Sequence, residues 1–203
     1  MLESLEIDSV QTLTQTSIGY NHKNKVNKTV ELVRDIDFVN RTIYMTSDNL
    51  LWTYENGKSH LFDKQSTKEH PIPENLDQVM EESFKYPFAL AALPYDYTFV
   101  RCDGWQTYGH LLRGKQIAFE TKLPLMFGGD VAPLNYVFNR KEQAIGAFVK
   151  MGKDNFQVAV FDIERLKNNL PVNVKIDYYA WRTGELESTV VIETVAYNGI
   201  AVK

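Results

Sequence analysis

The sequence predicts a mainly β (α+β) fold, a curved antiparallel sheet or half-barrel of about 9–11 strands with a helical insertion near residues 75–93. Aromatic residues, which favour strands, make up 12% of the chain. Short segments rich in Thr, Val, Ile, Tyr and Phe alternate with polar turns, and one stretch follows the helical period instead. The length of 203 residues suits a single domain, residues 1–203, that can bury its own core.

The first third of the chain, residues 10–66, has the pattern of a meander of strands. Leu50, Trp52 and Tyr54 share one face of a strand, because successive side chains of a strand point to opposite faces. Asn56-Gly57 follows them and is a strong signal for a two-residue turn. We therefore expect a hairpin at this position.

The pattern changes after Pro71-Ile72-Pro73, where a helical period begins. Asn75 can cap a helix, and Gln78 three residues later strengthens the cap. Pro87 is expected to end or kink this helix, so that residues 88–93 form a second short apolar helix. The apolar positions of the first helix are Leu76, Val79, Met80 and Phe84.

Strand patterns return after the helical segment, at Tyr97–Cys102, Tyr108–Leu112 and Gln116–Thr121. Asp103-Gly104 and Arg113-Gly114 separate these segments, and glycine is frequent in tight turns. We therefore expect a turn at each of the two dipeptides.

Residues 123–133 contain two prolines and two glycines, which predict an irregular loop that could act as a lid. Three more strands are expected at Tyr136–Phe138, Ala144–Met151 and Phe156–Ile163. Residues 163–169 could form a short helical turn instead of extending the last of these strands.

The C-terminal region has the clearest hairpin pattern. Val174, Ile176 and Tyr178 alternate with polar or charged residues, as in a strand with one buried face. Thr183-Gly184 marks a turn, and Val190–Val195 has the composition of a second strand. We expect these two strands to pair.

Charge and hydropathy argue against two classes of partner. The formal net charge is -4 and no dense Lys/Arg stripe is present, so a nucleic-acid partner is not expected. The longest apolar run, residues 88–94, is far shorter than the roughly 20 residues of a membrane-spanning helix. Residues 1–11 lack the pattern of a secretory signal, which indicates a cytoplasmic chain or a trimmed mature form that is periplasmic or secreted.

One polar cluster could support catalysis. Cys102 is the only cysteine and lies between Arg101 and Asp103, and a hairpin could bring it near His110. A neighbouring histidine can act as the base that forms a nucleophilic thiolate. A lone cysteine on a strand is more often a small buried hydrophobe, and this structural interpretation is preferred.

No cofactor or metal is expected. The four histidines, His22, His60, His70 and His110, are widely spaced and form no HxH or HExxH pattern. A single cysteine excludes a CxxC site, and the chain has neither a phosphate-binding P-loop nor a GxGxxG motif.

The clearest functional signal is apolar. Aromatic and aliphatic residues are concentrated in the helical insertion and in the loop at residues 123–133, and a site for an apolar ligand needs a concave lining of such residues. The alternative is an ordinary closed core, since buried aromatic residues usually serve packing. The candidate ligand-binding residues are Trp52, Tyr54, Phe84, Phe88, Leu90, Leu93, Phe119, Phe127 and Tyr136.

The order of these elements resembles the LolA-like lipoprotein-carrier superfamily, whose members fold as a half-barrel of antiparallel strands over short helices. The segments that carry the resemblance are residues 43–45, the hairpin LLWTYENGK at residues 50–58, residues 61–63, the helical segment 75–93, and the closing segments 170–176 and 190–198. The resemblance implies a hydrophobic concavity that holds acyl chains or another apolar ligand, with no catalytic residues to transfer. The chain departs from the family in showing neither a signal sequence nor a lipobox cysteine.

Two main functions follow as hypotheses. The first is a binding or carrier protein for an apolar or lipid-like ligand held between the curved sheet and the helical insertion. The alternative is a small β-barrel enzyme that acts on an apolar substrate through the residues around Cys102 and His110. A third hypothesis is a protein-interaction domain that docks a partner through residues 123–131.

Overall fold

The computed structural model of the protein describes residues 9–22, 30–72, 76–84, 98–108, 112–120, 134–140, 144–150, 156–168 and 170–202. Its helix, α1, is Leu76–Ser83. Its strands are β1 (Thr12–Asn21), β2 (Val30–Asp37), β3 (Thr42–Ser47), β4 (Leu50–Glu55), β5 (Lys58–Asp63), β6 (Thr98–Tyr108), β7 (Leu112–Glu120), β8 (Leu134–Phe138), β9 (Ala144–Lys150), β10 (Phe156–Arg165), β11 (Pro171–Ala180), β12 (Leu186–Tyr197) and β13 (Ile200–Ala201).

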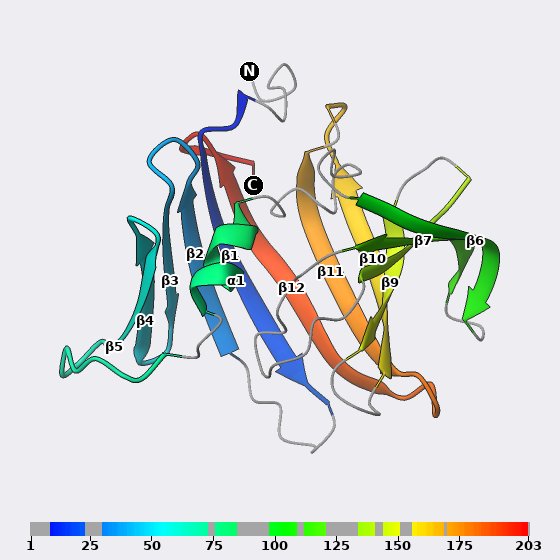
Figure 1. Ribbon diagram of the computed structural model, residues 1–203, viewed down its shortest axis with the longest axis horizontal. Helices are drawn as coiled ribbons and strands as arrows, with labels where there is room; N and C mark the ends of the chain where they lie inside the picture. Colours follow the sequence, from blue (N-terminus) through cyan, green and yellow to red (C-terminus); the bar gives the residue numbers. More distant parts are fainter. Residues whose placement is uncertain are drawn as a thin grey trace.

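These strands form one curved antiparallel sheet in the order β5-β4-β3-β2-β1-β12-β11-β10-β9-β8-β7-β6, with β13 paired to β12 (Figure 1). Two meanders, β1–β5 and β6–β12, are joined where the first strand pairs with β12. The predicted fold class is therefore confirmed. The described residues contain 13 strands, more than expected, because residues 10–66 supply five of them and the two-residue β13 adds another.

α1 lies in the connection between β5 and β6, the two opposite edges of the sheet. Figure 1 shows the helix in front of β1 and β2, on one face of the sheet. We name this side of the sheet the α1 face. Asn75 and residues 85–93, the remainder of the predicted helical insertion, lie outside the described residues. Within the described ranges, no helix has the length and apolar character that a membrane span requires.

Two predicted hairpins are confirmed by the pairing of their strands. In the β4–β5 hairpin, Glu55 pairs with Lys58, and the two residues between them have positive φ angles, 53° for Asn56 and 78° for Gly57. Such angles suit the turn types that follow the natural twist of a hairpin. The β11–β12 hairpin likewise has Gly184 in its turn, with a φ of 70°.

Two turn predictions in the second half of the chain are wrong. Asp103-Gly104 lies inside β6, where the pairing with β7 shifts register between Cys102 and Gly104, so the extra residue makes a bulge rather than a turn. Arg113-Gly114 lies inside β7. The strand predicted at Phe156–Ile163 is present as β10 and continues to Arg165, so residues 163–165 pair with β11 and do not follow the alternative of a helical turn.

Candidate functional site

The α1 face begins with a row of buried side chains across five strands. Directly paired residues of neighbouring strands share a face of the sheet, so the register defines the row. The row runs through Tyr197 of β12, Leu13 of β1, Ile36 of β2, Ile43 of β3 and Tyr54 of β4. All five side chains are buried, and they form the base of the main hydrophobic cluster.

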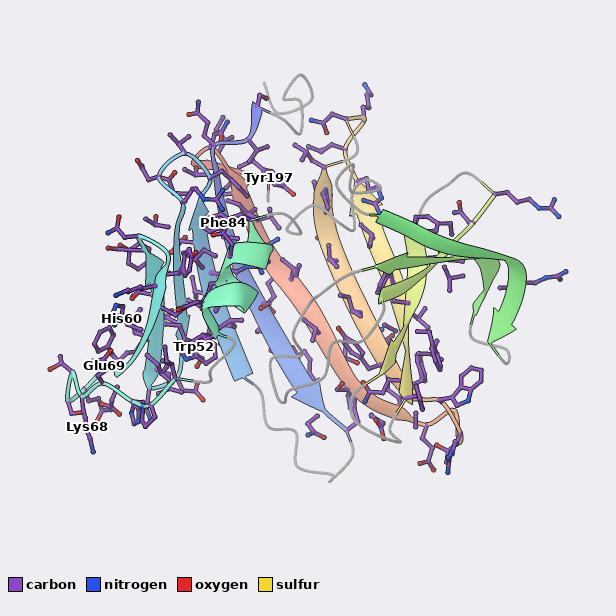
Figure 2. All side chains as sticks on the ribbon, viewed as in Figure 1. Trp52, His60, Lys68, Glu69, Phe84 and Tyr197 are labelled. Carbon is purple, nitrogen blue, oxygen red and sulfur yellow. The ribbon has the colours of Figure 1, made fainter. Side chains whose placement is uncertain are left out.

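α1 covers this row with one apolar stripe. Leu76, Met80 and Phe84 are spaced four residues apart, so they lie on the same side of the helix. All three are buried in the same cluster, and Met80 is fully inaccessible to solvent. The ring of Phe84 lies 5.8 Å from the ring of Tyr54, measured between centroids. Figure 2 shows Phe84 beside α1 and Trp52 on the neighbouring strand β4. The helix therefore completes a packed core at this end of the sheet.

Polar contacts fix the helix to the first meander. Tyr54 donates a hydrogen bond from its hydroxyl to Glu81 Oε2 at 2.6 Å, and Arg41 forms an ion pair with the same carboxylate. The guanidinium of Arg41 also lies 4.7 Å from the centroid of the Phe84 ring. Burial, and then the hydrogen bond to Glu81, raise the pKa of Tyr54 to about 12.

A second carboxylate holds the start of the helix. Asp77 Oδ1 accepts a hydrogen bond of 2.6 Å from the backbone N–H of Ser59 on β5. Asp77 and Glu81 are four residues apart and so lie on one side of α1. The two carboxylates thus attach both turns of the helix to the β4–β5 hairpin.

Replacement of Glu81 by glutamine is expected to lower the pKa of Tyr54 from about 12 toward its ordinary value of 10.0, because the negative charge that disfavours the tyrosinate is removed. The pKa should stay above the ordinary value, since burial remains. Titration of 13C-labelled tyrosine by NMR, with Tyr54→Phe to assign the signal, measures the shift. Glu69→Gln, a change at the exposed β5 edge, serves as the control. An unchanged pKa in Glu81→Gln would contradict the contact.

The second row of the α1 face contains a polar pair among apolar residues. Arg34 of β2 pairs in register with Gln15 of β1 and with Met45 of β3. Its Nη2 atom donates a hydrogen bond to Gln15 Oε1, and Gln15 is only 8% exposed. Burial lowers the pKa of Arg34, because the guanidinium loses hydration. Among the described residues, no carboxylate forms an ion pair with Arg34.

The α1 face remains apolar beyond the cluster that α1 covers. Because β12 pairs with β11 and β11 pairs with β10, the cross-strand rows of the α1 face continue onto β11 and β10. Most of the side chains in this second region are half-buried, so part of their apolar surface remains accessible. We name this region the apolar strip, and it consists of Val190 and Ile192 on β12, Val174, Ile176 and Tyr178 on β11, and Phe161 and Ile163 on β10.

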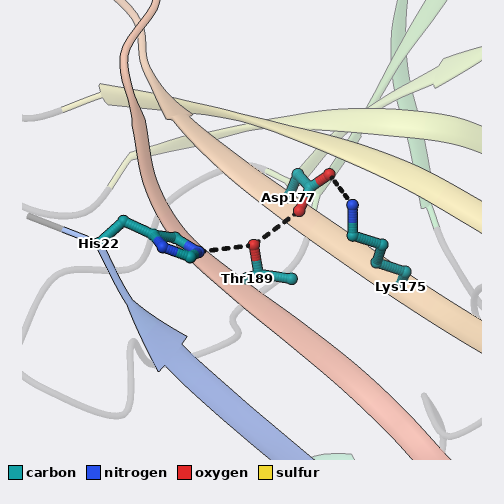
Figure 3. A network of polar contacts seen from close by, with 4 residues as sticks. All are labelled: His22, Lys175, Asp177 and Thr189. Atoms are coloured by element: carbon teal, nitrogen blue, oxygen red, sulfur yellow. Dashed lines mark hydrogen bonds and ion pairs between the residues drawn. The ribbon is translucent and has the colours of Figure 1, made fainter. Parts of the chain in front are cut away.

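The opposite face of the same strands is polar. Thr189 of β12 donates a hydrogen bond to Asp177 Oδ1 at 2.7 Å, and Lys175 donates to the other oxygen of this carboxylate at 2.7 Å (Figure 3). His22 Nε2 lies 3.1 Å from the Thr189 hydroxyl, whose only hydrogen is directed to Asp177, so His22 must donate. The network ties β11 and β12 to His22, which follows the end of β1, and the hydrogen bond to Asp177 raises the pKa of Lys175. The two faces of β11 and β12 thus differ in chemistry.

Comparisons with known proteins give no match of sequence and a distant match of structure. No protein-family model and no curated protein sequence matches the chain. Among solved structures, the chain is similar to a domain from Vibrio parahaemolyticus that is assigned as an outer membrane lipoprotein-sorting protein. The match covers 92% of this chain and 85% of that chain, with a TM-score of 0.38 and 7% sequence identity.

The structure brings three of the predicted ligand-binding residues together. Trp52, Tyr54 and Phe84 belong to one hydrophobic cluster, in which Tyr54 and Phe84 are buried and Trp52 packs against them. Phe119 and Tyr136 lie on β7 and β8, near the other edge of the sheet. The remaining predicted residues, Phe88, Leu90, Leu93 and Phe127, lie outside the described residues.

Three of the four candidate catalytic residues lie on an edge strand. Arg101, Cys102 and Asp103 belong to β6, where Cys102 pairs with Ile117 of β7 and Asp103 occupies the bulge. His110 lies outside the described residues. The predicted encounter of Cys102 with His110 therefore remains a prediction.

Another titratable cluster lies at the β5 edge. His60 Nδ1 lies 2.8 Å from Glu69 Oε1, and the His60 ring stacks on Phe62 with 5.8 Å between centroids. Figure 2 shows His60, Glu69 and Lys68 at this edge, away from α1. In the part of the chain that the structure describes, no group of three His, Cys, Asp or Glu side chains could hold a metal ion.

Sequence analysis missed Arg34 and Gln15. The signal was present in the alternation of β2, because Leu32, Arg34 and Ile36 occupy every second position and thus one face of the strand. A charged residue between two apolar ones at this spacing indicates a buried charge. Gln15 follows Leu13 at the same spacing on β1.

Proposed function

We propose that the protein binds an apolar or lipid-like ligand on the α1 face, between the curved sheet and the helical insertion. The observation that carries the proposal is the apolar strip on β10–β12, which begins at Ile192, packed against the cluster that α1 covers, and extends beyond that cluster. A contiguous, partly accessible apolar surface on a curved sheet is typical of a ligand site. Each Å² of apolar surface that a ligand covers contributes roughly 25 cal/mol before the costs of binding.

The chemistry of the strip supports binding rather than catalysis. Its seven side chains include no carboxylate, amine, imidazole or thiol. Tyr178 supplies its only hydroxyl, and burial raises the pKa of this phenol, which makes it a poorer base or nucleophile at neutral pH. A ligand on this surface would therefore be held by burial of apolar area.

Two neighbouring valines provide a matched test. Val190 belongs to the apolar strip and pairs with Ile176, whereas Val191 points to the opposite face and pairs with Lys175. Both valines are half-buried. We expect wild-type protein to bind the neutral apolar dye Nile red, and Val190→Glu to weaken this binding about tenfold or more, because a ligand would have to desolvate the new charge.

Val191→Glu should bind Nile red as the wild type does. Dye fluorescence gives the affinities, and circular dichroism verifies that each variant is folded. Should Val190→Glu be unfolded, Val190→Thr keeps the shape of valine but adds a hydroxyl to the strip, and it should bind Nile red more weakly than the wild type. Equal affinity of the Val190 and Val191 variants, or no dye binding by the wild type, would overturn the proposal.

A further inference from the structure

Arg34 has an unusual environment for an arginine. It lies in a cross-strand row with Val195, Gln15, Met45 and Trp52, so the other members of this row are apolar apart from one amide. A guanidinium has five N–H donors and no acceptor. Gln15 Oε1 accepts from one of them.

The described residues give Arg34 no carboxylate as an ion-pair partner. A buried charge is normally paired, since removing it from water is costly without a compensating charge. On β1 to β4, the rows on either side contain no further cation, and their polar members near Arg34 include the small residues Ser17 and Ser47. Arg34 retains some accessible surface, so an anion that enters along the α1 face can reach this residue.

We propose that Arg34 binds the carboxylate head group of a single-chain fatty acid whose tail lies along the apolar strip. This inference rests on the proposed function and specifies its ligand class. Arginine recognises carboxylates with two parallel hydrogen bonds, which suits a guanidinium with free donors. One arginine neutralises one charge, and a carboxylate carries one, whereas a phosphate monoester carries closer to two at neutral pH.

The sheet provides a path between the head-group site and the strip. Four strand spacings separate β2 from β10, about 19 Å in total, which a long acyl chain can span. On the strand between Arg34 and the strip, β1, the α1 face carries Ser17 and Gly19 after Gln15. These are small residues, so no large side chain of β1 blocks the path.

The test compares cis-parinaric acid, a fluorescent fatty acid, with its methyl ester, which has the same tail and no charge. The wild type should bind the acid about tenfold more tightly than the ester, as expected for one charge-assisted pair in a partly buried site. In Arg34→Gln this ratio should fall to about one, while ester affinity stays the same. Arg182→Gln, which removes an exposed arginine in the β11–β12 turn, should keep the wild-type ratio.

The outcomes separate the two proposals. If the wild type binds neither probe, the proposed function fails together with the role of Arg34. If it binds acid and ester equally, the head-group role of Arg34 is overturned while the proposed function stands; this comparison needs no variant. If hexadecyl phosphate displaces the probe more strongly than palmitate does, the preferred head group is a phosphate. This result would overturn the proposal that Arg34 binds a carboxylate.

Discussion

Replacement of Met80 by alanine is expected to destabilise the protein by about 2–5 kcal/mol, the range for truncating a fully buried methionine in a core. Met80 lies at the centre of the α1 stripe and is inaccessible to solvent. Truncation would leave a cavity between the helix and the row that includes Leu13 and Ile36. Urea unfolding followed by tryptophan fluorescence measures the loss as a lower midpoint.

Met80→Leu is the matched control, because it conserves volume and should cost less than about 1.5 kcal/mol. The same pair of variants tests whether α1 is a fixed part of the core or a loosely seated cover. If α1 opened readily, truncating Met80 would change the free energy of unfolding of the protein only slightly. An equal loss of stability in Met80→Ala and Met80→Leu would therefore contradict the packed arrangement. The expected difference between the variants follows from the burial of the whole stripe.

Sequence patterns predicted the features that depend on neighbours along the chain. Asn56-Gly57 needs positive φ angles, and those two residue types tolerate them better than others. The stripe of Leu76, Met80 and Phe84 follows from the helical period alone. Local geometry therefore determined these elements, and tertiary contacts did not alter them.

Sequence patterns could not separate the buried core from the partly accessible apolar strip. Tyr54 and Phe84 have the character of pocket residues, but the distinction depends on what lies above them, and α1 buries both. The apolar strip includes Ile176 and Tyr178, and their alternation with polar residues predicted a strand. The alternation did not indicate that β10 and β12 lie on either side of this strand and add their apolar residues to the same face. Register is a long-range property, since β1 pairs with β12 across most of the chain.

The wrong turn predictions have a common cause. A glycine after a polar residue is equally compatible with a turn, a bulge or a close approach of two strands. Gly104 follows a register shift in β6, which accommodates an extra residue without reversing the chain. Gly114 lies inside β7, where the neighbouring strand β8 leaves no room for a side chain.

Gly114→Ala is therefore expected to destabilise the protein by about 3 kcal/mol, toward the upper end of the range for overpacking. A Cβ atom at this position would overlap the Phe138 carbonyl oxygen and would lie 2.7 Å from Val137 Cγ1. Both neighbours are buried, and a backbone carbonyl cannot rotate away as a flexible side chain can. The strands β7 and β8 would have to separate, which weakens the pairing of Lys115 with Phe138.

Gly57→Ala separates this steric effect from the loss of glycine itself. Gly57 has a φ of 78° and open space around its Cα, so alanine there meets only the backbone penalty, about 1 kcal/mol. Urea midpoints should thus fall much further for Gly114→Ala than for Gly57→Ala, and amide hydrogen exchange should accelerate in β7 and β8. Equal losses would mean that β7 and β8 lie far enough apart to admit a methyl group, which would contradict the close approach at Gly114.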